Sequence, residues 1–367
     1  MHRRWRFDLA PQRVYWEVTG ACDLACRHCR AAAAPHPAPG ELTTREGLAL
    51  IEGLARFGTP LPRLVLTGGD PLKRSDLFSL IAAARARGFL VSVAPSATPL
   101  LTSEIVDRLK EAGVEAVSLS LDGSDAARHD ALRGVAGCFD RTIAAARACA
   151  RTGLAFQINT LVSEETLEDL PAIRQLAAGL DAARWSLFFL VAVGRGVVLR
   201  PITAEACERL FEQLVDLGMQ PGPVIATTEA PHFRRVVLEQ ARRRGSSRET
   251  APPRPLGHGA GIRDGNGIMF ISQTGLVYPS GFFALPAGRV TTADPVDLYR
   301  DSGLFRALRR PDLFGGRCGR CEWRELCGGS RARAFAATGD PLAEDPLCLY
   351  EPAGPSTSKK REVAELK

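Results

Sequence analysis

The feature that most constrains the fold is a regular alternation of short apolar segments with amphipathic ones. The apolar segments have the length of buried strands and cover residues 14–18, 63–67, 89–94, 115–121, 154–162 and 185–191. Segments with helical spacing of apolar residues follow them, the last at 203–217. This alternation predicts an α/β protein with a parallel sheet and right-handed helical crossovers. The pattern alone leaves two architectures open, a partial barrel of six units and an open doubly wound sheet.

Unusual residues lie in the loops where these strands end. Cys22, Cys26 and Cys29 follow the first strand with the spacing C-x3-C-x2-C, and Gly68-Gly69-Asp70 follows the second. Ligands gather at the carboxyl ends of parallel strands in both architectures. Three thiolates suit an iron–sulfur cluster or zinc, and they leave one coordination position uncovered. A Gly-Gly-Asp loop alone is typical of a tight turn, but beside an open metal site it indicates ligand binding.

A second group of thiols lies near the carboxyl end of the sequence. Cys318, Cys321, Cys327 and Cys348 have the spacing C-x2-C-x5-C-x20-C. Four thiols are enough to close either a zinc tetrahedron or a four-iron cluster, so spacing leaves both open. The other three cysteines stand singly in helical patterns, where we expect buried packing; they are Cys138, Cys149 and Cys207.

Composition narrows the class of protein. The 367 residues are 45% hydrophobic, which is ample for a large core, and the formal net charge of +6 comes from arginines spread along the chain. Such a distribution indicates anionic substrates or solubility rather than a nucleic-acid groove. Neither a membrane span nor a signal peptide is recognisable, so we expect a cytoplasmic protein with no membrane partner. In a reducing compartment, ten cysteines indicate metal ligands and buried residues rather than disulfides.

The strand–helix rhythm stops after Gly218, which suggests a division of the chain. We expect a core at 1–218, a connecting segment with one polar helix at 219–266, a cysteine-rich module at 267–351 and a disordered tail at 352–367. The module begins with two short strands, 267–272 and 275–279, joined as a hairpin. The basic run between residues 234 and 244 has a simple interpretation as the solvated face of the polar helix.

Together these loops resemble one known family. The three-cysteine loop, the Gly-Gly-Asp loop and Ser120-Leu121-Asp122-Gly123 resemble the radical S-adenosylmethionine (SAM) superfamily over about residues 13–200. The hairpin and the later cysteines resemble its cluster-bearing extension, called SPASM, or the shorter Twitch form. Four segments are similar to a subgroup near the enzymes that trim haem side chains, the alternative-haem decarboxylases and the enzyme of denitrification-haem synthesis; the segments are 67–72, 96–100, 189–196 and 327–334.

The resemblance implies a partial (β/α)6 TIM-like barrel followed by a small cysteine-rich extension. Cys22, Cys26 and Cys29 would hold a [4Fe-4S] cluster whose fourth iron binds SAM. The motif that meets the methionine amine corresponds to Gly68, Gly69 and Asp70, with aspartate in place of the commoner glutamate. His28 stands where the family usually has an aromatic residue and would pack near the adenine. The other positions matched to SAM-binding loops are Ser96, Ser120, Asp122, Arg133 and Asn159.

The resemblance also implies one auxiliary [4Fe-4S] cluster, held by Cys318, Cys321, Cys327 and Cys348. A full SPASM module binds two auxiliary clusters and has further cysteines in the hairpin and after Cys327. This chain has Ser280 in the hairpin position, and Ser330 and Arg331 after Cys327. One auxiliary cluster is therefore the more economical prediction.

The implied activity is reductive cleavage of SAM to a 5′-deoxyadenosyl radical, which abstracts a hydrogen atom from a substrate; an electron donor such as flavodoxin or ferredoxin would be a partner. The first hypothesis for the substrate is a haem-like tetrapyrrole undergoing oxidative decarboxylation or side-chain modification. Candidate carboxylate-pairing cations are Arg195, His232, Arg234, Arg235 and Arg331. The alternative is a ribosomally made peptide, although peptide modifiers frequently carry a recognition domain before the barrel and only some dozen residues precede the first strand here. A third hypothesis, a non-catalytic zinc scaffold, fits poorly with the intact three-cysteine loop.

Overall fold

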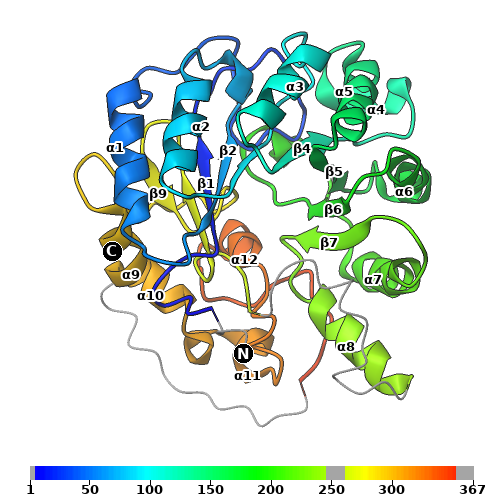
Figure 1. Ribbon diagram of the computed structural model, residues 1–367. Coiled ribbons are helices and arrows are strands. Elements are labelled where there is room, and N and C mark those ends of the chain that lie inside the picture. Colours follow the sequence, from blue (N-terminus) through cyan, green and yellow to red (C-terminus); the bar gives the residue numbers. More distant parts are fainter. Residues whose placement is uncertain (1–4, 245–260, 353–367) are drawn as a thin grey trace.

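A single curved sheet organises the computed structural model, which describes residues 5–244 and 261–352. Its strands lie in the order β10-β9-β8-β1-β2-β3-β4-β5-β6-β7. From β8 to β7 every neighbouring pair is parallel, whereas β9 is antiparallel to both of its neighbours, β8 and β10. Figure 1 shows this sheet with helices around it.

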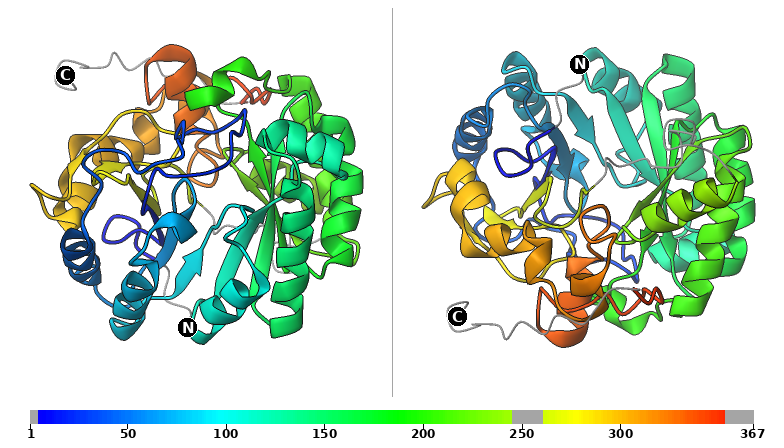
Figure 2. Two further views of the ribbon diagram at one scale, coloured as in Figure 1. Left: turned by 90° about the horizontal axis from the view of Figure 1, so that it is seen from above. Right: turned by 90° about the horizontal axis from the view of Figure 1, so that it is seen from below.

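Seven strands and seven helices form the barrel region. The strands are β1 (Arg13–Glu17), β2 (Arg63–Thr67), β3 (Val91–Val93), β4 (Ala116–Ser120), β5 (Ala155–Val162), β6 (Arg184–Phe189) and β7 (Val224–Thr228). The helices are α1 (Thr44–Ala55), α2 (Leu77–Ala86), α3 (Ser103–Glu111), α4 (Ala126–Arg133), α5 (Cys138–Thr152), α6 (Leu170–Gly179) and α7 (Ala204–Gly218). Views along the barrel show these helices on the outside of the curved sheet (Figure 2). The predicted partial (β/α) barrel is therefore confirmed.

Each barrel strand presents alternate residues to two different surroundings. On β1, Val14 and Trp16 are fully buried in the core between the sheet and the outer helices, while Arg13 and Tyr15 face the interior of the barrel. The same alternation recurs along β2, β4, β5 and β6. Residues that face the outer helices are apolar, and they make the strands recognisable in the sequence. The alternate residues, which face the barrel interior, can be polar.

Local signals in the sequence account for most element boundaries. The expected capping box at the start of α1 is present, with the Thr43 hydroxyl accepting from the Glu46 amide and the Glu46 carboxylate accepting from the Thr43 amide. Two elements of the barrel region were not anticipated. The short helix α4 lies between β4 and α5, and β7 lies in the segment expected to connect the core to the cysteine-rich module.

The remaining elements come from the carboxyl-terminal part of the chain. They are α8 (Phe233–Arg243), β8 (Ile268–Ile271), β9 (Leu276–Tyr278), β10 (Gly288–Arg289), α9 (Pro295–Asp301), α10 (Gly303–Leu308), α11 (Gly316–Arg320) and α12 (Arg331–Thr338). The expected hairpin is present as β8 and β9. Its first strand pairs in parallel with β1, from Arg13 opposite Ile268 to Trp16 opposite Ile271. The hairpin thus extends the barrel sheet.

The end of β7 is joined to the carboxyl-terminal part by a small group of contacts. The partly buried Glu229 carboxylate accepts from the hydroxyls of Ser330 and Ser280, and the Arg333 guanidinium donates to the Glu229 carbonyl. Ser330 caps α12, which lies in Figure 1 between the β1 and β7 sides of the sheet. These contacts bridge the two sides of the barrel.

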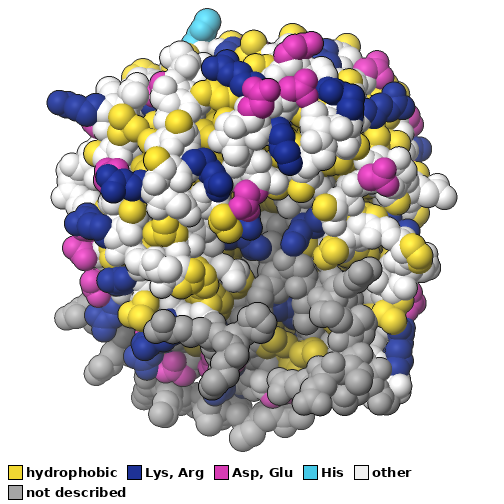
Figure 3. Space-filling view, viewed as in Figure 1, with side chains coloured by type: hydrophobic (Ala, Val, Ile, Leu, Met, Phe, Trp, Pro, Cys, Tyr) yellow, Lys and Arg dark blue, Asp and Glu magenta, His cyan; other side chains and the backbone are white. Residues whose placement is uncertain are grey.

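The proposed division into a core, a connecting segment and a cysteine-rich module stays a prediction, and residues 353–367 of the expected tail lie outside the described residues. Within residues 5–244 and 261–352, no helix has the length and apolar character needed to cross a membrane. The face drawn in Figure 3 carries basic and acidic side chains interspersed with one another.

Candidate active site

The three cysteines of the first loop line one pocket of about 220 Å³ at the carboxyl ends of the strands, hereafter the first thiol pocket. Cys22 and Cys26 are buried, and Cys29 is partly exposed. Each sulfur has a donor nearby: the Leu24 amide lies 3.4 Å from Cys22 Sγ, the Ala33 amide 3.5 Å from Cys29 Sγ, and Arg133 Nη1 3.7 Å from Cys26 Sγ. Donors of this kind stabilise thiolate ligands, so the pocket suits a cluster held by these three residues.

The Gly-Gly-Asp loop packs directly against the backbone of the cysteine loop. The Gly69 amide donates to Thr19 O at 2.8 Å, and the Asp70 amide donates to Ala21 O at 2.7 Å. A Cβ atom on Gly69 would lie 2.3 Å from Ala21 O, so no larger residue fits without moving the loop. The glycines therefore allow two loops to approach each other, and they line the pocket as well.

Asp70 has a supporting position rather than a pocket-facing one. Its carboxylate accepts from the Thr98 hydroxyl at 2.7 Å and from the amides of Leu72 and Ser96 at 3.1 and 3.3 Å. Burial raises the pKa of Asp70, and these three donors oppose that effect. Because the carboxylate is enclosed by protein donors, its direct effect is to hold the loops that carry Gly69 and Ser96.

A buried ion pair supports the opposite side of the pocket. Arg133, at the end of α4, donates to the Asp122 carboxylate, which also accepts from the Leu161 amide at 2.7 Å. Burial works against ionisation of Asp122, but the Arg133 guanidinium and the two neighbouring histidines outweigh it and lower the pKa. Burial also lowers the pKa of His28 to about 4, so its ring is neutral near pH 7. The pocket therefore combines a fixed cation with a neutral imidazole.

The loop after β6 is hydrogen-bonded to the cysteine loop through Arg195. Arg195 donates to Cys26 O and Ala33 O, both at 2.9 Å, and its own amide donates to Cys29 O at 2.9 Å. The Nη2 atom of Arg195 is buried without a hydrogen-bond partner among the described residues. A guanidinium that holds the metal-binding loop and keeps one donor available is suited to an anionic group in this pocket.

Most of the residues predicted to bind SAM line the first thiol pocket. They are His28, Gly68, Gly69, Ser96, Ser120, Arg133 and Asn159. Asp70 and Asp122 lie behind the pocket wall and act through the groups that they hold. A further thiol, Cys138, lines the pocket too, although its position in a helical pattern indicated only packing. Their roles toward SAM stay predictions.

The four later cysteines line a second, smaller cavity of about 30 Å³, hereafter the second thiol pocket. The amides of Trp323 and Gly329 lie 3.4 Å from the sulfurs of Cys321 and Cys327. Cys318 Sγ lies 3.5 Å from both Arg331 Nη2 and the Asp345 amide. Burial raises the pKa of Cys327 and Cys348 to about 12, so these thiols favour the thiolate form only with a metal or cation beside them.

Neither thiol pocket has its sulfurs at the spacing of a formed zinc site. A tetrahedral zinc site with Zn–S bonds of about 2.3 Å places its sulfurs roughly 3.8 Å apart. Among the described residues, no three cysteine sulfurs lie within 4.8 Å of one another. The choice between zinc and an iron–sulfur cluster in the group of four later cysteines therefore stays a prediction.

The five predicted substrate cations fall in different places. Arg195 lines the first thiol pocket, and His232 and Arg235 line the second. Arg331 is fully buried and donates to backbone carbonyls, including Ala343 O at 2.5 Å. Arg235 is paired with Glu208 and Glu239. Arg234 lines the barrel interior, and neither Arg234 nor Arg235 lies on the solvated helix face that the basic run suggested.

The barrel interior contains a cavity of about 470 Å³, hereafter the barrel cavity. It shares wall residues with the first thiol pocket, among them Arg30, Ser118, Asn159 and Phe282, so the two spaces are adjacent. Aromatic side chains form part of its wall: Tyr15, Phe156, Phe188, Phe270 and Phe282. Six arginines contribute as well: Arg13, Arg30, Arg63, Arg184, Arg234 and Arg263. Only Arg234 was predicted, although Arg13, Arg63 and Arg184 each begin a strand.

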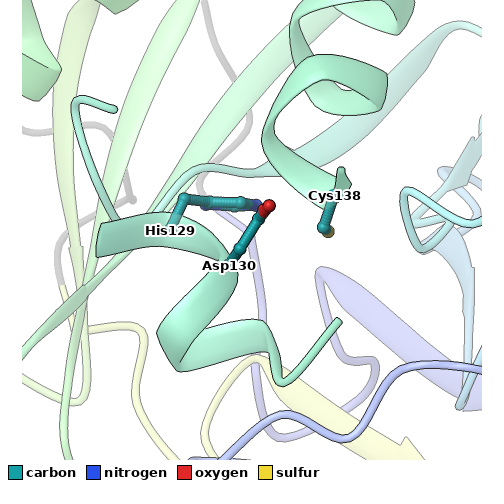
Figure 4. Close-up of side chains that lie close together, drawn as sticks. All are labelled: His129, Asp130 and Cys138. Atoms are coloured by element: carbon teal, nitrogen blue, oxygen red, sulfur yellow. The ribbon is translucent and has the colours of Figure 1, made fainter. Parts of the chain in front are cut away.

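One further group combines side chains of the metal-binding type. Figure 4 shows His129 and Asp130 extending from α4 toward Cys138 at the start of α5, and their ligand atoms lie within 4.8 Å of one another. The Asp122 amide donates to His129 Nδ1 at 3.0 Å, so a neutral ring carries its proton on Nε2 and has no lone pair there for a metal. The Asp130 carboxylate accepts from the amides of Gly137 and Phe139. This group therefore has the geometry of a cap for α5.

Comparison with known sequences agrees with this geometry. Residues 16–177 match the radical SAM superfamily. The chain is 39% identical to an AdoMet-dependent heme synthase of Oleidesulfovibrio alaskensis, over 92% of this chain and 87% of that protein. It is 37% identical to the AdoMet-dependent heme synthase of Methanosarcina barkeri, over 94% and 97% of the two chains. It is 32% identical to the pre-heme d1 synthase of Dinoroseobacter shibae, over 94% of this chain and 88% of that protein.

Comparison with solved structures agrees on the fold. The crystal structure of SuiB from Streptococcus suis bound to S-adenosylmethionine superimposes with a TM-score of 0.72 at 18% identity, over 93% of this chain and 78% of that one. A partial barrel with a three-thiol pocket at its carboxyl edge defines a class of radical enzymes. The chain belongs to the radical SAM superfamily. Like other members, it is an enzyme that binds a [4Fe-4S] cluster and SAM.

Proposed function

We propose that this enzyme modifies the carboxylate side chains of a haem-like tetrapyrrole, by oxidative decarboxylation of propionate groups. The observation that carries the proposal is the barrel cavity, which is wide, partly aromatic, rich in arginine and adjacent to the first thiol pocket. Aromatic walls suit a flat macrocycle, and arginines suit its carboxylates. The heme synthases at 37–39% identity support the same substrate class.

When bound, the cluster and SAM supply a 5′-deoxyadenosyl radical that takes one hydrogen atom from the substrate. We assign the cluster to Cys22, Cys26 and Cys29, and contact with SAM to the residues that line their pocket. Arg133 and Arg195 place cations beside these thiols, while Gly68 and Gly69 keep the loops close together.

Loss of a hydrogen atom and of carbon dioxide from a propionate leaves a vinyl group and one electron. The second thiol pocket is a suitable acceptor site, with an auxiliary [4Fe-4S] cluster on Cys318, Cys321, Cys327 and Cys348. Gly329 belongs to the wall of both this pocket and the barrel cavity. An external donor such as flavodoxin or ferredoxin would supply the electron that begins each turnover, and the expected cytoplasmic location stays a prediction.

The test is anaerobic incubation of the reconstituted enzyme with SAM, a reductant and an iron-bound tetrapyrrole tetracarboxylate. We expect loss of carbon dioxide from the tetrapyrrole, detected as a mass decrease, together with stoichiometric 5′-deoxyadenosine. A peptide substrate, the second candidate, rests on the fold shared with SuiB. Substrate-dependent 5′-deoxyadenosine formation with a peptide and none with tetrapyrroles would overturn the proposal.

A further inference from the structure

Two arginines from separate parts of the chain lie near each other in the wall of the barrel cavity. Arg234 belongs to α8, and Arg263 lies just before β8. Both line the barrel cavity, and they are only 6% and 5% exposed. The charge of Arg234 contributes to lowering the pKa of Arg263, so their guanidiniums are close enough to repel each other. These two residues are hereafter the arginine pair.

The hydrogen bonds of the arginine pair go to backbone carbonyls. Arg234 Nη1 donates to Leu326 O at 3.3 Å. Arg263 donates to Gly261 O and Leu308 O at 3.1 and 3.4 Å, and its Nε atom is buried without a hydrogen-bond partner. Burial lowers the pKa of each guanidinium to about 10. The carbonyls satisfy part of the donor capacity and supply no counter-charge.

Other arginines of the cavity wall differ from the pair, because they have carboxylate partners. Arg30 lies 3.1 Å from Glu17, and Arg63 lies 2.8 Å from Glu115. Within residues 5–244 and 261–352, no carboxylate oxygen lies within 4.0 Å of a guanidinium nitrogen of the arginine pair. A buried cation without such a partner favours an anion that can enter the cavity.

The acidic residues of the same wall are hydrogen-bonded to other groups. The Glu229 carboxylate accepts from the hydroxyls of Ser280 and Ser330. Asp264 accepts from the Ala332 amide at 2.9 Å. Burial and the charge of Asp264 raise the pKa of Glu229 well above its ordinary value, so Glu229 is neutral near pH 7. These two acidic residues therefore contribute one negative charge, against the two positive charges of the arginine pair.

The arginine pair also packs against the loop that carries Cys327. Leu326, whose carbonyl accepts from Arg234, precedes this cysteine. A Cβ atom on Gly328 would lie 2.8 Å from Arg263 Cδ, so Arg263 is in close contact with the residue that follows the cysteine. The arginine pair is absent from the lining of the first thiol pocket. An anion bound by the pair would therefore lie beside the second thiol pocket.

We propose that Arg234 and Arg263 together bind one carboxylate of the substrate, where the wall of the barrel cavity adjoins the second thiol pocket. Guanidinium groups match a carboxylate in charge and in planar geometry. This inference rests on the proposed function and adds the residues that hold a particular part of the tetrapyrrole. The carboxylate bound there is not the one that reacts, since hydrogen abstraction occurs at the first thiol pocket. It anchors the macrocycle with one edge beside the site assigned to the electron acceptor.

The test is a binding titration with coproporphyrin III, a tetracarboxylate, and with its tetramethyl ester, using metal-loaded enzyme and SAM. We expect saturable binding of the acid and at least tenfold weaker binding of the ester. Arg234→Gln and Arg263→Gln should each weaken binding of the acid by about 10- to 100-fold, since each removes charged hydrogen bonds. Arg234→Lys should recover part of the loss. Arg200→Gln, at an 84% exposed side chain, is the control and should bind like wild type.

The outcomes separate the inference from the proposed function. If both glutamine variants bind the acid as tightly as wild type, the arginine pair is not a carboxylate site, while the proposed function stands. If wild type binds neither porphyrin and turns over only peptides, the proposed function fails. Should the variants lose their fold or their metal, as judged by circular dichroism and metal content, the wild-type comparison decides. Equal affinity for acid and ester then overturns the inference, and weaker binding of the ester supports it.

Discussion

The two thiol pockets use similar local chemistry and differ in size and in the number of thiols. In both, sulfurs receive contacts from backbone amides and from one arginine, Arg133 in the first pocket and Arg331 in the second. The first pocket has three thiols, a volume of about 220 Å³ and an adjoining cavity. The second has four thiols and about 30 Å³. Ligand number and volume, more than the type of donor, distinguish a pocket with room for a further ligand from one whose thiols can complete a metal site without it.

The same contrast appears in what each arginine does besides contacting sulfur. Arg133 pairs with Asp122, which lies behind the wall of the first pocket. Arg331 is fully buried and donates to the carbonyls of Gly329, Pro341 and Ala343. Hydrogen bonds between residues 329 and 343 thus stabilise the second pocket, whereas side chains from several barrel strands complete the wall of the first. The shape of the first pocket therefore depends on the whole barrel.

The largest expected effect comes from removing one thiol from each pocket. Cys26→Ala should abolish cleavage of SAM to 5′-deoxyadenosine under dithionite, because the open cluster loses one of only three ligands. Cys327→Ala should leave this cleavage measurable while product formation from the substrate stops. Each variant should contain about four fewer irons per chain than wild type, which should contain about eight. Retained SAM cleavage in Cys26→Ala, or about four irons in wild type, would contradict the assignment of the two pockets.

The next effect concerns the ion pair behind the first pocket. Arg133→Gln leaves the 2% exposed Asp122 carboxylate without its cation, and we expect a loss of about 3–5 kcal/mol in the free energy of unfolding. SAM should bind more weakly as well. Arg151→Gln is the control, because that arginine makes a surface pair with Asp107 and should change stability by at most about 1 kcal/mol. Equal unfolding midpoints for the two variants would show that the pair is not structural.

A smaller effect is expected from a change at Asp70, whose carboxylate supports the Gly-Gly-Asp loop. Asp70→Asn replaces one acceptor oxygen by a donor that faces protein donors, so we expect a loss of about 1–3 kcal/mol and weaker SAM binding by isothermal titration. Thr98→Val removes only one of the three donors and should have a milder effect. Native SAM affinity in Asp70→Asn would mean that the loop needs no such support.

The smallest effect is a pH dependence from His129. Burial lowers its pKa to about 4 from an ordinary value of 6.5, so the unfolded chain takes up the proton first as the pH falls. The stability contributed by the neutral ring is therefore present above about pH 6.5 and is lost toward pH 4. His129→Gln cannot titrate, and the stability difference between wild type and this variant should shrink by at most about 2 kcal/mol between pH 7.5 and 5. Anaerobic thermal melts at both pH values measure it, and a constant difference would exclude His129 as the source.

Sequence patterns predicted the barrel because its strands are apolar on the buried outer face and its helices carry clear caps. They missed β7, which is short and follows a run of proline and glycine, and α4, whose few apolar positions give no stripe. The cysteine loops were recognisable from spacing alone. The supporting position of Asp70 was not, since it depends on contacts with Thr98 and Ser96 from the next strand's loop. The arginines of the barrel cavity were visible only as a residue type at the starts of strands β1, β2 and β6, and tertiary structure was needed to bring them to one cavity.

The parallel pairing of β8 with β1 has a consequence for how the protein is made. β1 leaves the ribosome well before its partner on one side, Ile268–Ile271, which is synthesised only after β2 to β7. Until then β1 presents an unpaired edge, which is a site for aggregation. Long-range pairing of this kind also slows folding. The loop that holds the first three thiols follows β1, so it reaches its final support late in the synthesis of the chain.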